Sequence, residues 1–329
     1  MVTMKDIAEL TGVSISTVSR VLHNKGNISE KVRKKVLSAC EELTFNKGLV
    51  AQSATRTAYN IALILPFEGE YFNNDPNTSF DIRMIKSTLE SQGHLPKIYF
   101  SPIDEKQLIK DNIDGIILSD PIIDGSTIEK ILKSKIPYLI TNGVYRDKDL
   151  FQIDYDNYNG MKKITNYVIS KGHNNLLLLA GPRNHLVVKN RIDGFIDSIN
   201  KDINYKIIYG DFSLNSGYTR IKELISKNEL KNVSCIMAVS DYIAIGAIRA
   251  LMEAKIKIPE QISITGFDNI EVSAYTTPPL STINRVSEGF AYYVINSLTT
   301  RITKKFEISS STTFFKTDII ERDSVINFV

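Results

Sequence analysis

From Tyr59 onward, short apolar runs of strand length alternate with stretches of helical periodicity. This alternation is typical of parallel sheets with helices on both faces, because parallel strands are joined through crossovers. The pattern restarts after Asp156, so we expect two similar α/β lobes, each built on a doubly wound sheet. The expected strands cover 61–65, 97–100, 113–118, 138–141, 176–180, 205–209, 235–239 and 262–267. The expected helices cover 82–92, 128–132, 160–170, 189–200, 217–227 and 242–254.

Polar and aromatic residues follow several of the expected strands. Ligands of parallel α/β sheets bind beyond the carboxyl ends of the strands, which makes these positions candidate ligand contacts. A guanidinium fork and a carboxylate can hold vicinal hydroxyls, while an aromatic ring packs on the apolar face of a sugar. Each residue alone fits a surface ion pair or a core aromatic, but together they favour a sugar cleft. The residues assigned to this cleft are Phe67, Phe80, Arg191, Phe212, Ser240, Asp241 and Asp268.

The first 58 residues are predicted to form a separate basic head. They contain nine Lys and Arg and five Asp and Glu, a net charge of +4, whereas the remaining chain carries −1. Such a basic segment favours nucleic-acid binding because it neutralises phosphates. Gly12 separates two short helical patterns, 3–10 and 15–22, and a third follows. The spacing predicts a three-helix helix-turn-helix domain over 1–47.

The second helix of such a domain enters the major groove with its N-terminal residues at the base edges. Arg20 can pair with guanine, Ile15 can meet a thymine methyl group, and Ser16 can hydrogen-bond to a base or a phosphate. Other polar side chains fit phosphate contacts, which position the helix without specifying sequence. These phosphate contacts are Thr17, Ser19 and Asn24, and the N-cap candidates Thr3 and Ser14 complete the predicted DNA-contacting set in the head.

The head closely resembles the DNA-binding domain of the lactose/galactose-repressor (LacI/GalR) family in residues 2–8, 12–14 and 17–22. Features of that family continue through the body at Gly181-Pro182, Arg191, Gly194-Phe195, Ser240-Asp241, Gly246, 266–269, 278–280 and Thr282-Ile283. The resemblance therefore covers essentially the whole chain. It implies a two-lobed, periplasmic-binding-protein-like effector and dimerisation domain over 59–329. The implied N-lobe is about 59–171 with 286–312, and the C-lobe is about 172–285 with 313–329.

The resemblance also implies roles for the cleft residues. Arg191 and Asp268 would hydrogen-bond the effector, Phe212 would stack on it, and Ser240-Asp241 would line the C-lobe. Lys189 stands where some relatives have a second arginine, and lysine keeps the charge but loses the bidentate fork. These positions define the effector site that the resemblance predicts.

The resemblance also implies a hinge over 48–58, a short helix that inserts a leucine from each subunit into the minor groove of the operator. Ala51 and Ala54 are the hinge residues expected to contact DNA. Ala54 occupies the expected leucine position, and Lys47 the usual proline position. Two alternatives follow: a weaker DNA kink, or a shifted register in which Leu49 takes the leucine's place.

Several function classes are excluded by the sequence. Neither a membrane-spanning run nor a signal peptide is found, so we expect a cytoplasmic protein. A Gly-rich phosphate loop, a metal-ligand cluster and a nucleophile elbow are also missing, so we expect no enzyme, metal or cofactor. Cys40 and Cys235 have no metal-type spacing and are expected to be buried thiols of a reducing compartment. Without a heptad tail, and with two half-sites in an operator, a homodimer is expected.

The expected function is repression of a sugar-utilisation operon, with release from the operator when the sugar binds. The acidic segment 68–76 resembles the galactoside and raffinose-type oligosaccharide branch. One alternative is a regulator of the same family that responds to a purine or a phosphoprotein co-repressor. A more distant alternative is a transport-type sugar-binding protein, which would have no use for a basic helical head.

Replacing Arg20 with Ala should weaken binding to the specific operator by roughly 10- to 100-fold, because one bidentate contact with guanine is lost. Binding to random DNA should fall much less. Fluorescence anisotropy with an operator selected from a random-sequence library, at fixed salt, measures both affinities. An equal loss on both DNAs would remove Arg20 from base recognition.

Overall fold

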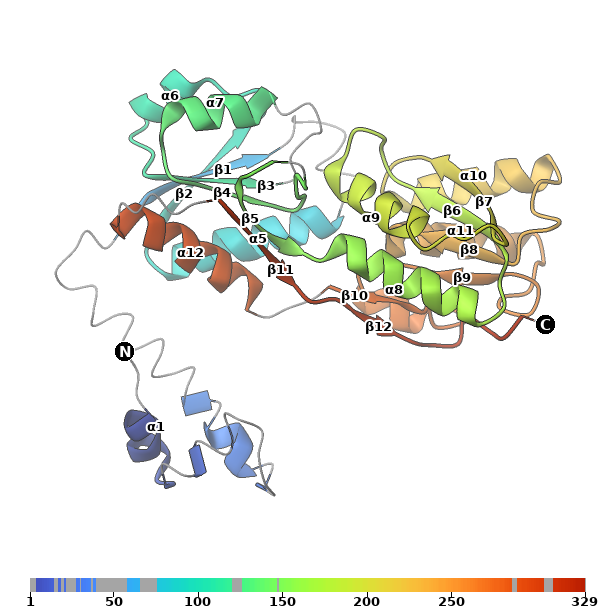
Figure 1. Cartoon of the computed structure of the whole chain (residues 1–329), viewed down its shortest axis with the longest axis horizontal. Coiled ribbons are helices and arrows are strands. Elements are labelled where there is room, and N and C mark those ends of the chain that lie inside the picture. Colours follow the sequence, from blue (N-terminus) through green and yellow to red (C-terminus); the bar gives the residue numbers. More distant parts are fainter. Residues whose placement is uncertain are drawn as a thin grey trace. The chain divides into compact units, whose positions relative to one another are not determined.

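The computed structural model describes residues 4–14, 17–18, 21, 28–29, 31–36, 38–39, 58–65, 76–119, 126–146, 148–285, 289–304 and 310–328. The chain forms two compact units, Met1–Ala58 and Tyr59–Val329 (Figure 1). Among the described helices, none has the length and apolar character that crossing a bilayer requires.

The small unit begins with helix α1 (Met4–Thr11) and turns at Gly12, whose φ of +64° suits a residue without Cβ. Its small core contains side chains from successive helical segments: Ala8, Val18, Val21, Val36 and Ala39. Leu10, although apolar, is exposed on this helix. Thr11 is buried instead, because it lies three residues after Ala8 and shares its helix face, whereas position 10 points away.

The large unit contains the two expected lobes. The first is a six-stranded sheet in the order β11-β5-β4-β3-β1-β2, and its strand pairs are all parallel. The inner strands β1, β3 and β4 are nearly continuous buried apolar runs, as expected for a parallel sheet covered on both faces, whereas the edge strands β2 and β11 are partly exposed. The strands are β1 (Asn60–Leu65), β2 (Leu95–Phe100), β3 (Gly115–Ser119), β4 (Tyr138–Thr141), β5 (Phe151–Tyr155) and β11 (Ser311–Phe315).

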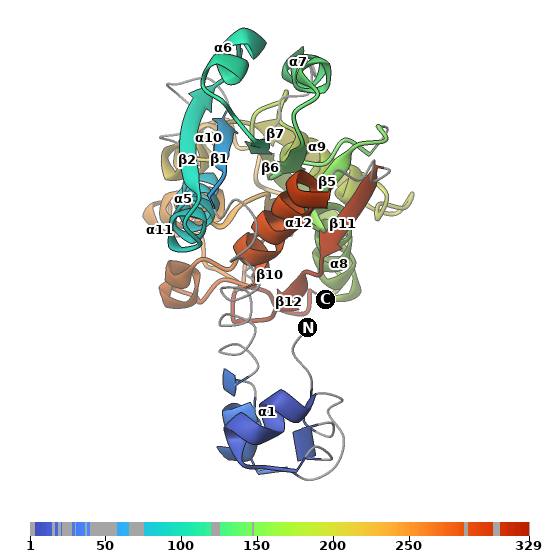
Figure 2. The same ribbon diagram turned by 90° about the vertical axis from the view of Figure 1, so that its left-hand side faces the viewer.

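Helices cover both faces of this sheet. One face packs against α5 (Pro76–Ser91) and α12 (Phe290–Lys304), and the other against α6 (Glu105–Lys110) and α7 (Ser126–Ser134). Figures 1 and 2 both show these pairs of helices on opposite sides of the sheet. Of these elements, β5, α6, α12 and β11 were absent from the sequence-based prediction.

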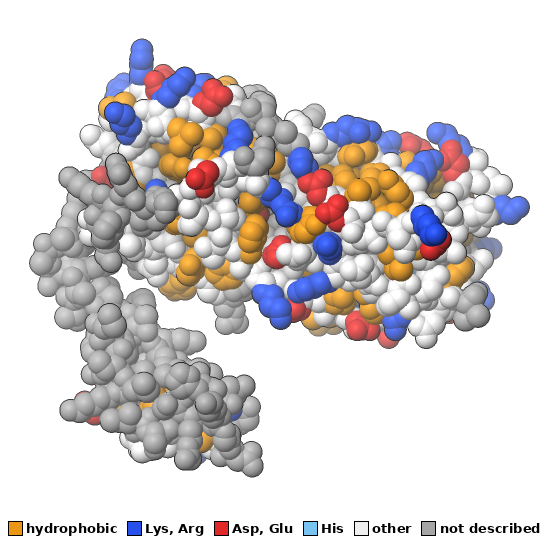
Figure 3. Space-filling model, in the orientation of Figure 1, with side chains coloured by type: hydrophobic (Ala, Val, Ile, Leu, Met, Phe, Trp, Pro, Cys, Tyr) orange, Lys and Arg blue, Asp and Glu red, His pale blue; other side chains and the backbone are white. Residues whose placement is uncertain are grey.

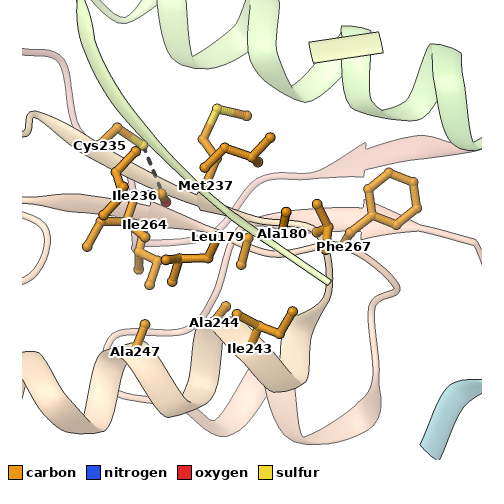
Figure 4. Close-up of a cluster of buried hydrophobic side chains, with 14 of the residues drawn as sticks. Leu179, Ala180, Cys235, Ile236, Met237, Ile243, Ala244, Ala247, Ile264 and Phe267 are labelled. Carbon is orange, nitrogen blue, oxygen red and sulfur yellow. Dashed lines mark hydrogen bonds between the residues drawn. The ribbon is translucent and has the colours of Figure 1, made fainter. Parts of the chain in front are cut away.

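The second lobe is built on a four-stranded parallel sheet in the order β7-β6-β8-β9. Its core lies between the sheet and its helices; Figure 4 shows Ile243, Ala244 and Ala247 packed beneath strand residues such as Leu179 and Ile264. Cys235 is fully buried in this core, as predicted, whereas Cys40 lies outside the described residues. The strands are β6 (Asn175–Ala180), β7 (Asn204–Tyr209), β8 (Cys235–Ala238) and β9 (Ser263–Thr265). The helices are α8 (Asn157–Ser170), α9 (Leu186–Ile196), α10 (Leu214–Ser226), α11 (Asp241–Glu253) and the short 3-10 helix η1 (Glu271–Tyr275).

The lobe boundaries differ from those expected. Side chains of α8, including Ile164 and Val168, belong to the core of the second lobe, so the first crossing precedes residue 157 rather than following residue 171. All of β11 pairs with β5 in the first sheet, beyond the expected division at 312. The chain then enters β12 (Asp318–Ile320), which pairs with β10 (Thr282–Asn284). Each correction places a helix or strand with the core that buries its apolar side chains.

Helices α10 and α11 approach each other backbone to backbone at two glycines. A Cβ on Gly217 would lie 2.0 Å from the Ile243 carbonyl oxygen, and one on Gly246 would lie 1.9 Å from the Leu214 carbonyl oxygen. Any side chain at these positions would force the two helices apart. The close approach therefore depends on glycine in both helices.

Replacing Gly246 with Ala should lower the free energy of unfolding by at least about 2 kcal/mol, because overpacking against backbone outweighs the gain in helix propensity. Urea unfolding followed by circular dichroism measures the change. Gly289→Ala is the matched control, since a Cβ there meets no atom within 4 Å. Equal stabilities of the Gly246 variant and this control would contradict the close helix contact.

Candidate ligand site at the junction of the two lobes

Arg191 lies on α9 and has its guanidinium group buried at the edge of the second sheet. Its Nε donates to Asn157 Oδ1 at 2.9 Å, Nη2 donates to Asp268 Oδ1 at 3.1 Å, and Nη1 donates to the Val239 carbonyl. The guanidinium carbon lies 3.8 Å from the centroid of the Phe267 ring. The side chains of Arg191 and Asp268 are each only 3% exposed. The structure thus brings together the two residues predicted to hydrogen-bond the effector.

Asp268 connects this pair to the first lobe. Its carboxylate also accepts from Nε of Arg285 at 2.9 Å, and Nη2 of Arg285 donates to Asp81 on α5 at 2.9 Å. The backbone of Asp268 has φ = +123°, an unfavourable value for a residue with a Cβ, and its N–H donates to the Ile283 carbonyl at 2.8 Å. A continuous series of charged contacts therefore runs from Arg191 in the second lobe to Asp81 in the first.

A third carboxyl group, Asp154 at the end of β5, belongs to the same junction. It accepts from the Tyr155 N–H at 2.7 Å and from Nδ2 of Asn157 at 3.1 Å, so Asn157 bridges Asp154 and Arg191. Burial raises the pKa of Asp154 to about 7, against the opposing effect of Arg285. The buried carboxyl is thus poised between its neutral and ionised forms near neutral pH.

Ser240 and Asp241 have bonding roles inside the second lobe. Ser240 is the N-cap of α11 and accepts from the Ile243 N–H at 3.4 Å. Asp241 accepts from the Thr282 hydroxyl at 2.6 Å and from the Ile270 N–H at 2.9 Å. Burial, and then the neighbouring charge of Asp268, raise the pKa of Asp241 to about 7. These contacts join the start of α11 to the segment that carries Asp268.

The remaining predicted cleft residues lie apart from this network or outside the described part of the chain. Phe212 is buried in the core of the second lobe, edge-on to the His185 ring at 5.0 Å between centroids. Lys189 is exposed and pairs with Asp193 at 2.7 Å, because residues two apart on α9 face opposite ways and only Arg191 points inward. Phe67 lies outside the described residues, and for Phe80 only the helical backbone is described.

Two of the predicted DNA contacts in the head are described. Ser14 Oγ accepts from the Thr17 N–H at 3.1 Å and lies 2.9 Å from its hydroxyl, which caps the start of the second helix as expected of an N-cap residue. The other predicted contacts lie outside the described residues: Thr3, Ile15, Ser16, Ser19, Arg20, Asn24, Ala51 and Ala54.

Sequence reasoning did not identify Asp81, Asp154, Asn157 and Arg285 as junction residues. Strand β5, which carries Asp154, was absent from the sequence-based prediction, and Asp81 and Arg285 are 204 residues apart and meet only in the folded chain. A polar pair at the ends of β3 and β4 was missed as well: Asn142 Nδ2 donates to Ser119 Oγ at 2.9 Å. Within the described part of the chain, no side-chain cluster suited to a metal ion occurs.

Comparisons with known proteins match both units. Residues 3–47 match the family described as bacterial regulatory proteins, lacI family, and residues 165–325 match the periplasmic binding protein-like domain. The chain is 30% identical over 336 residues to the "Probable HTH-type transcriptional repressor ExuR" of Bacillus subtilis (strain 168), covering 99% of this chain and 98% of that protein. It is 28% identical over 343 residues to the HTH-type transcriptional repressor PurR of Actinobacillus pleuropneumoniae serotype 3 (strain JL03), covering 99% of each.

Solved structures show the same fold. The transcriptional regulator CelR–cellobiose complex superimposes with a TM-score of 0.71 at 23% identity, covering 98% of this chain and 100% of that chain. The lac repressor dimer bound to operator and the anti-inducer ONPF gives a TM-score of 0.70 at 22% identity, covering 99% of each. These similarities confirm the predicted fold class of a helix-turn-helix head and a two-lobed periplasmic-binding-protein-like body.

Asp154→Asn should change how stability depends on pH. An unfolded carboxyl titrates near 3.9, whereas Asp154 in the folded protein titrates at about 7. Between these two pH values the unfolded chain binds fewer protons than the folded protein. The free energy of unfolding of the wild type therefore falls as pH rises through this range. Relative to wild type, the variant should therefore gain stability from pH 5 to 7, by at most about 1.4 kcal/mol per pH unit.

Urea unfolding at pH 5, 6, 7 and 8 measures this difference. Asp202→Asn, at an exposed position, is the control and should give a difference that does not change with pH. If the stability difference between Asp154→Asn and the wild type were also independent of pH, the Asp154 carboxyl of the wild type would have to be ionised over the whole range from pH 5 to 8.

Proposed function

The chain belongs to the lacI family of bacterial regulatory proteins, and we propose that it represses a sugar-utilisation operon until a sugar effector releases it. It is a DNA-binding transcription regulator and not an enzyme. The observation that supports an effector site is the buried Arg191–Asp268 pair, which lies beyond the strand ends and is linked to both lobes. A charged pair buried in this way is held only at the cost of desolvation, as is common at functional sites.

The chemistry of this pair suits a sugar. Hydroxyl groups can donate to the Asp268 carboxylate and accept from guanidinium N–H groups, whereas a purely apolar ligand can do neither. The transcriptional regulator CelR, a relative in fold, has been solved in complex with cellobiose. Phe212, Ser240 and Asp241 remain proposed contacts for this effector, together with Phe67, Phe80 and Lys189.

In the head we propose that Arg20, Ile15 and Ser16 contact bases. The basic charge of this segment and its family match support that assignment. The body carries little net charge, and on its face in Figure 3 acidic and basic side chains are interspersed. The proposed phosphate contacts are Thr3, Ser14, Thr17, Ser19 and Asn24, and the proposed hinge contacts are Ala51 and Ala54. Because it acts on the chromosome, we place the protein in the cytoplasm.

The proposed assembly is a homodimer that presents two heads to a two-fold operator. Large apolar side chains are exposed on α5 and on the edge strand β2, at Met84, Leu95 and Ile98. In the second lobe Tyr275 is 78% exposed. Exposed apolar residues on an edge strand and its neighbouring helix favour contact with another chain.

Coupling between the two sites follows from the junction. An effector that contacts Asp268 acts on a network that also holds Asp81 in the first lobe, so binding favours one lobe orientation over the other. We propose that this orientation releases the operator. The second candidate, a purine-responsive regulator, is favoured by the 28% identity to the repressor PurR over 99% of both chains.

A thermal-shift screen of the full-length protein with mono- and oligosaccharides and with purine bases separates these two candidates. A ligand that binds only the folded state raises the free energy of unfolding by RT ln(1 + [L]/Kd), so the melting temperature rises with ligand concentration. A shift with a sugar alone supports the proposal. A shift with a purine and no sugar would replace the sugar effector by a purine.

Replacing Asp268 with Asn should abolish the response to the sugar found in that screen, with affinity reduced by at least about 100-fold, because a charge-assisted acceptor is lost. Operator affinity should stay nearly unchanged, since the head is a separate unit. Calorimetric titration and operator anisotropy measure the two effects. Asp202→Asn, at an exposed position, is the matched control; an Asp268 variant that binds the sugar like this control would refute the proposed contact.

A further inference from the structure

The cations at the lobe junction are occupied by groups of the protein itself. Arg191 directs Nε, Nη1 and Nη2 to an amide oxygen, a carbonyl oxygen and a carboxylate. Arg285 directs Nε to Asp268 and Nη2 to Asp81. A negatively charged ligand would therefore have to displace a carboxylate that is already in place.

Carboxyl groups also outnumber guanidinium groups at this junction. Asp81, Asp154 and Asp268 face Arg191 and Arg285, and the charges of both arginines act on Asp154. Asp81 raises the pKa of Asp154, which shows that the acidic groups are close enough to repel one another. With Asp154 partly protonated near neutral pH, the carboxylates of Asp81 and Asp268 balance the two guanidinium groups, so the described residues of the junction leave no surplus positive charge for a further anion.

The first lobe adds acceptors that need donors. Asn142 follows β4 at the carboxyl edge of the first sheet and is buried, and its Oδ1 has no hydrogen-bond partner among the described residues. Oγ1 of the neighbouring Thr141 also has no partner among the described residues, but this hydroxyl can donate as well as accept and does not discriminate between the two kinds of ligand. An unpaired buried acceptor is costly, and a ligand hydroxyl group can donate to it whereas an ionised phosphate or carboxylate cannot.

We propose that this protein selects an uncharged, hydroxyl-rich ligand and rejects the phosphate esters and acids of the same sugar, with Asp81 as the specificity-determining residue. Asp81 acts by holding Arg285, which would otherwise offer its guanidinium fork to an anion. The inference rests on the proposed ligand site, but it concerns only the charge of the ligand. It therefore applies to a sugar and to a purine alike.

The test measures binding to matched pairs that differ only in charge. Glucose, galactose, mannose and ribose are each compared with their terminal phosphate and with the corresponding sugar acid, and a purine base with its 5′-nucleotide. Thermal shift identifies the pair that binds, and calorimetric titration of the full-length protein gives Kd for each member. In the wild type, the neutral member should bind at least about 100-fold more tightly than its anionic partner.

Asp81→Asn keeps the size of the side chain and an oxygen that can accept from Arg285, but removes the charge. In this variant the Kd of the anionic member divided by the Kd of the neutral member should fall by at least about 10-fold. Asp202→Asn removes an exposed carboxylate away from the proposed site and should leave the ratio at the wild-type value. Melting temperatures of both variants verify folding, and the ratio is taken within each variant, so a general loss of affinity does not alter it.

The outcomes separate the inference from the proposed function. Preference for a neutral sugar, reduced by Asp81→Asn, supports both. Preference for a sugar phosphate or sugar acid overturns the inference and leaves a sugar sensor, whereas preference for a purine base over its nucleotide supports the inference and removes the sugar. A ratio unchanged by Asp81→Asn removes Asp81 as the specificity residue. Binding of neither member of any pair overturns both.

Discussion

A buried guanidinium group organises the junction of the two lobes. Arg191 is 3% exposed, and a charge held away from water destabilises a protein by several kcal/mol unless partners surround it. Its partners come from three separate segments: Asn157 at the start of α8, the carbonyl of Val239 after β8, and Asp268 after β9. Each of these segments must therefore end at a fixed place, which explains why Asp268 keeps a backbone conformation that favours glycine.

The same requirement links the lobes. Asp268 is shared between Arg191 and Arg285, and Arg285 extends to Asp81 on α5 of the first lobe. The chain also crosses between the lobes close to this network, just after Asp154 and just after β10. A ligand that rearranges one carboxylate at the junction thereby alters contacts of both lobes, which is the property that a regulator needs to transmit binding to its DNA-binding heads.

Much of the architecture was predictable because buried parallel strands consist of consecutive apolar residues. The expected strand 138–141 was correct to the residue, and α10 and α11 were correct to within three residues at each end. Errors arose where local pattern and tertiary contact disagree. Leu10 fits an apolar stripe but faces solvent, and α8 follows the first sheet in sequence but packs on the second. Periodicity identifies a helix, but it does not say which core buries that helix.

The sequence by itself determined the helix-turn-helix head, the alternation that produces two α/β lobes, and the meeting of Arg191 with Asp268, because family motifs and strand periodicity are local properties. Only the tertiary structure decided how that pair is completed. The contact between Asp81 and Arg285 joins residues 204 positions apart. Strand β11 pairs with β5, and Gln152 and Thr312 of these strands are 160 positions apart. Such contacts depend on charge and burial in three dimensions, and no local pattern in the sequence records them.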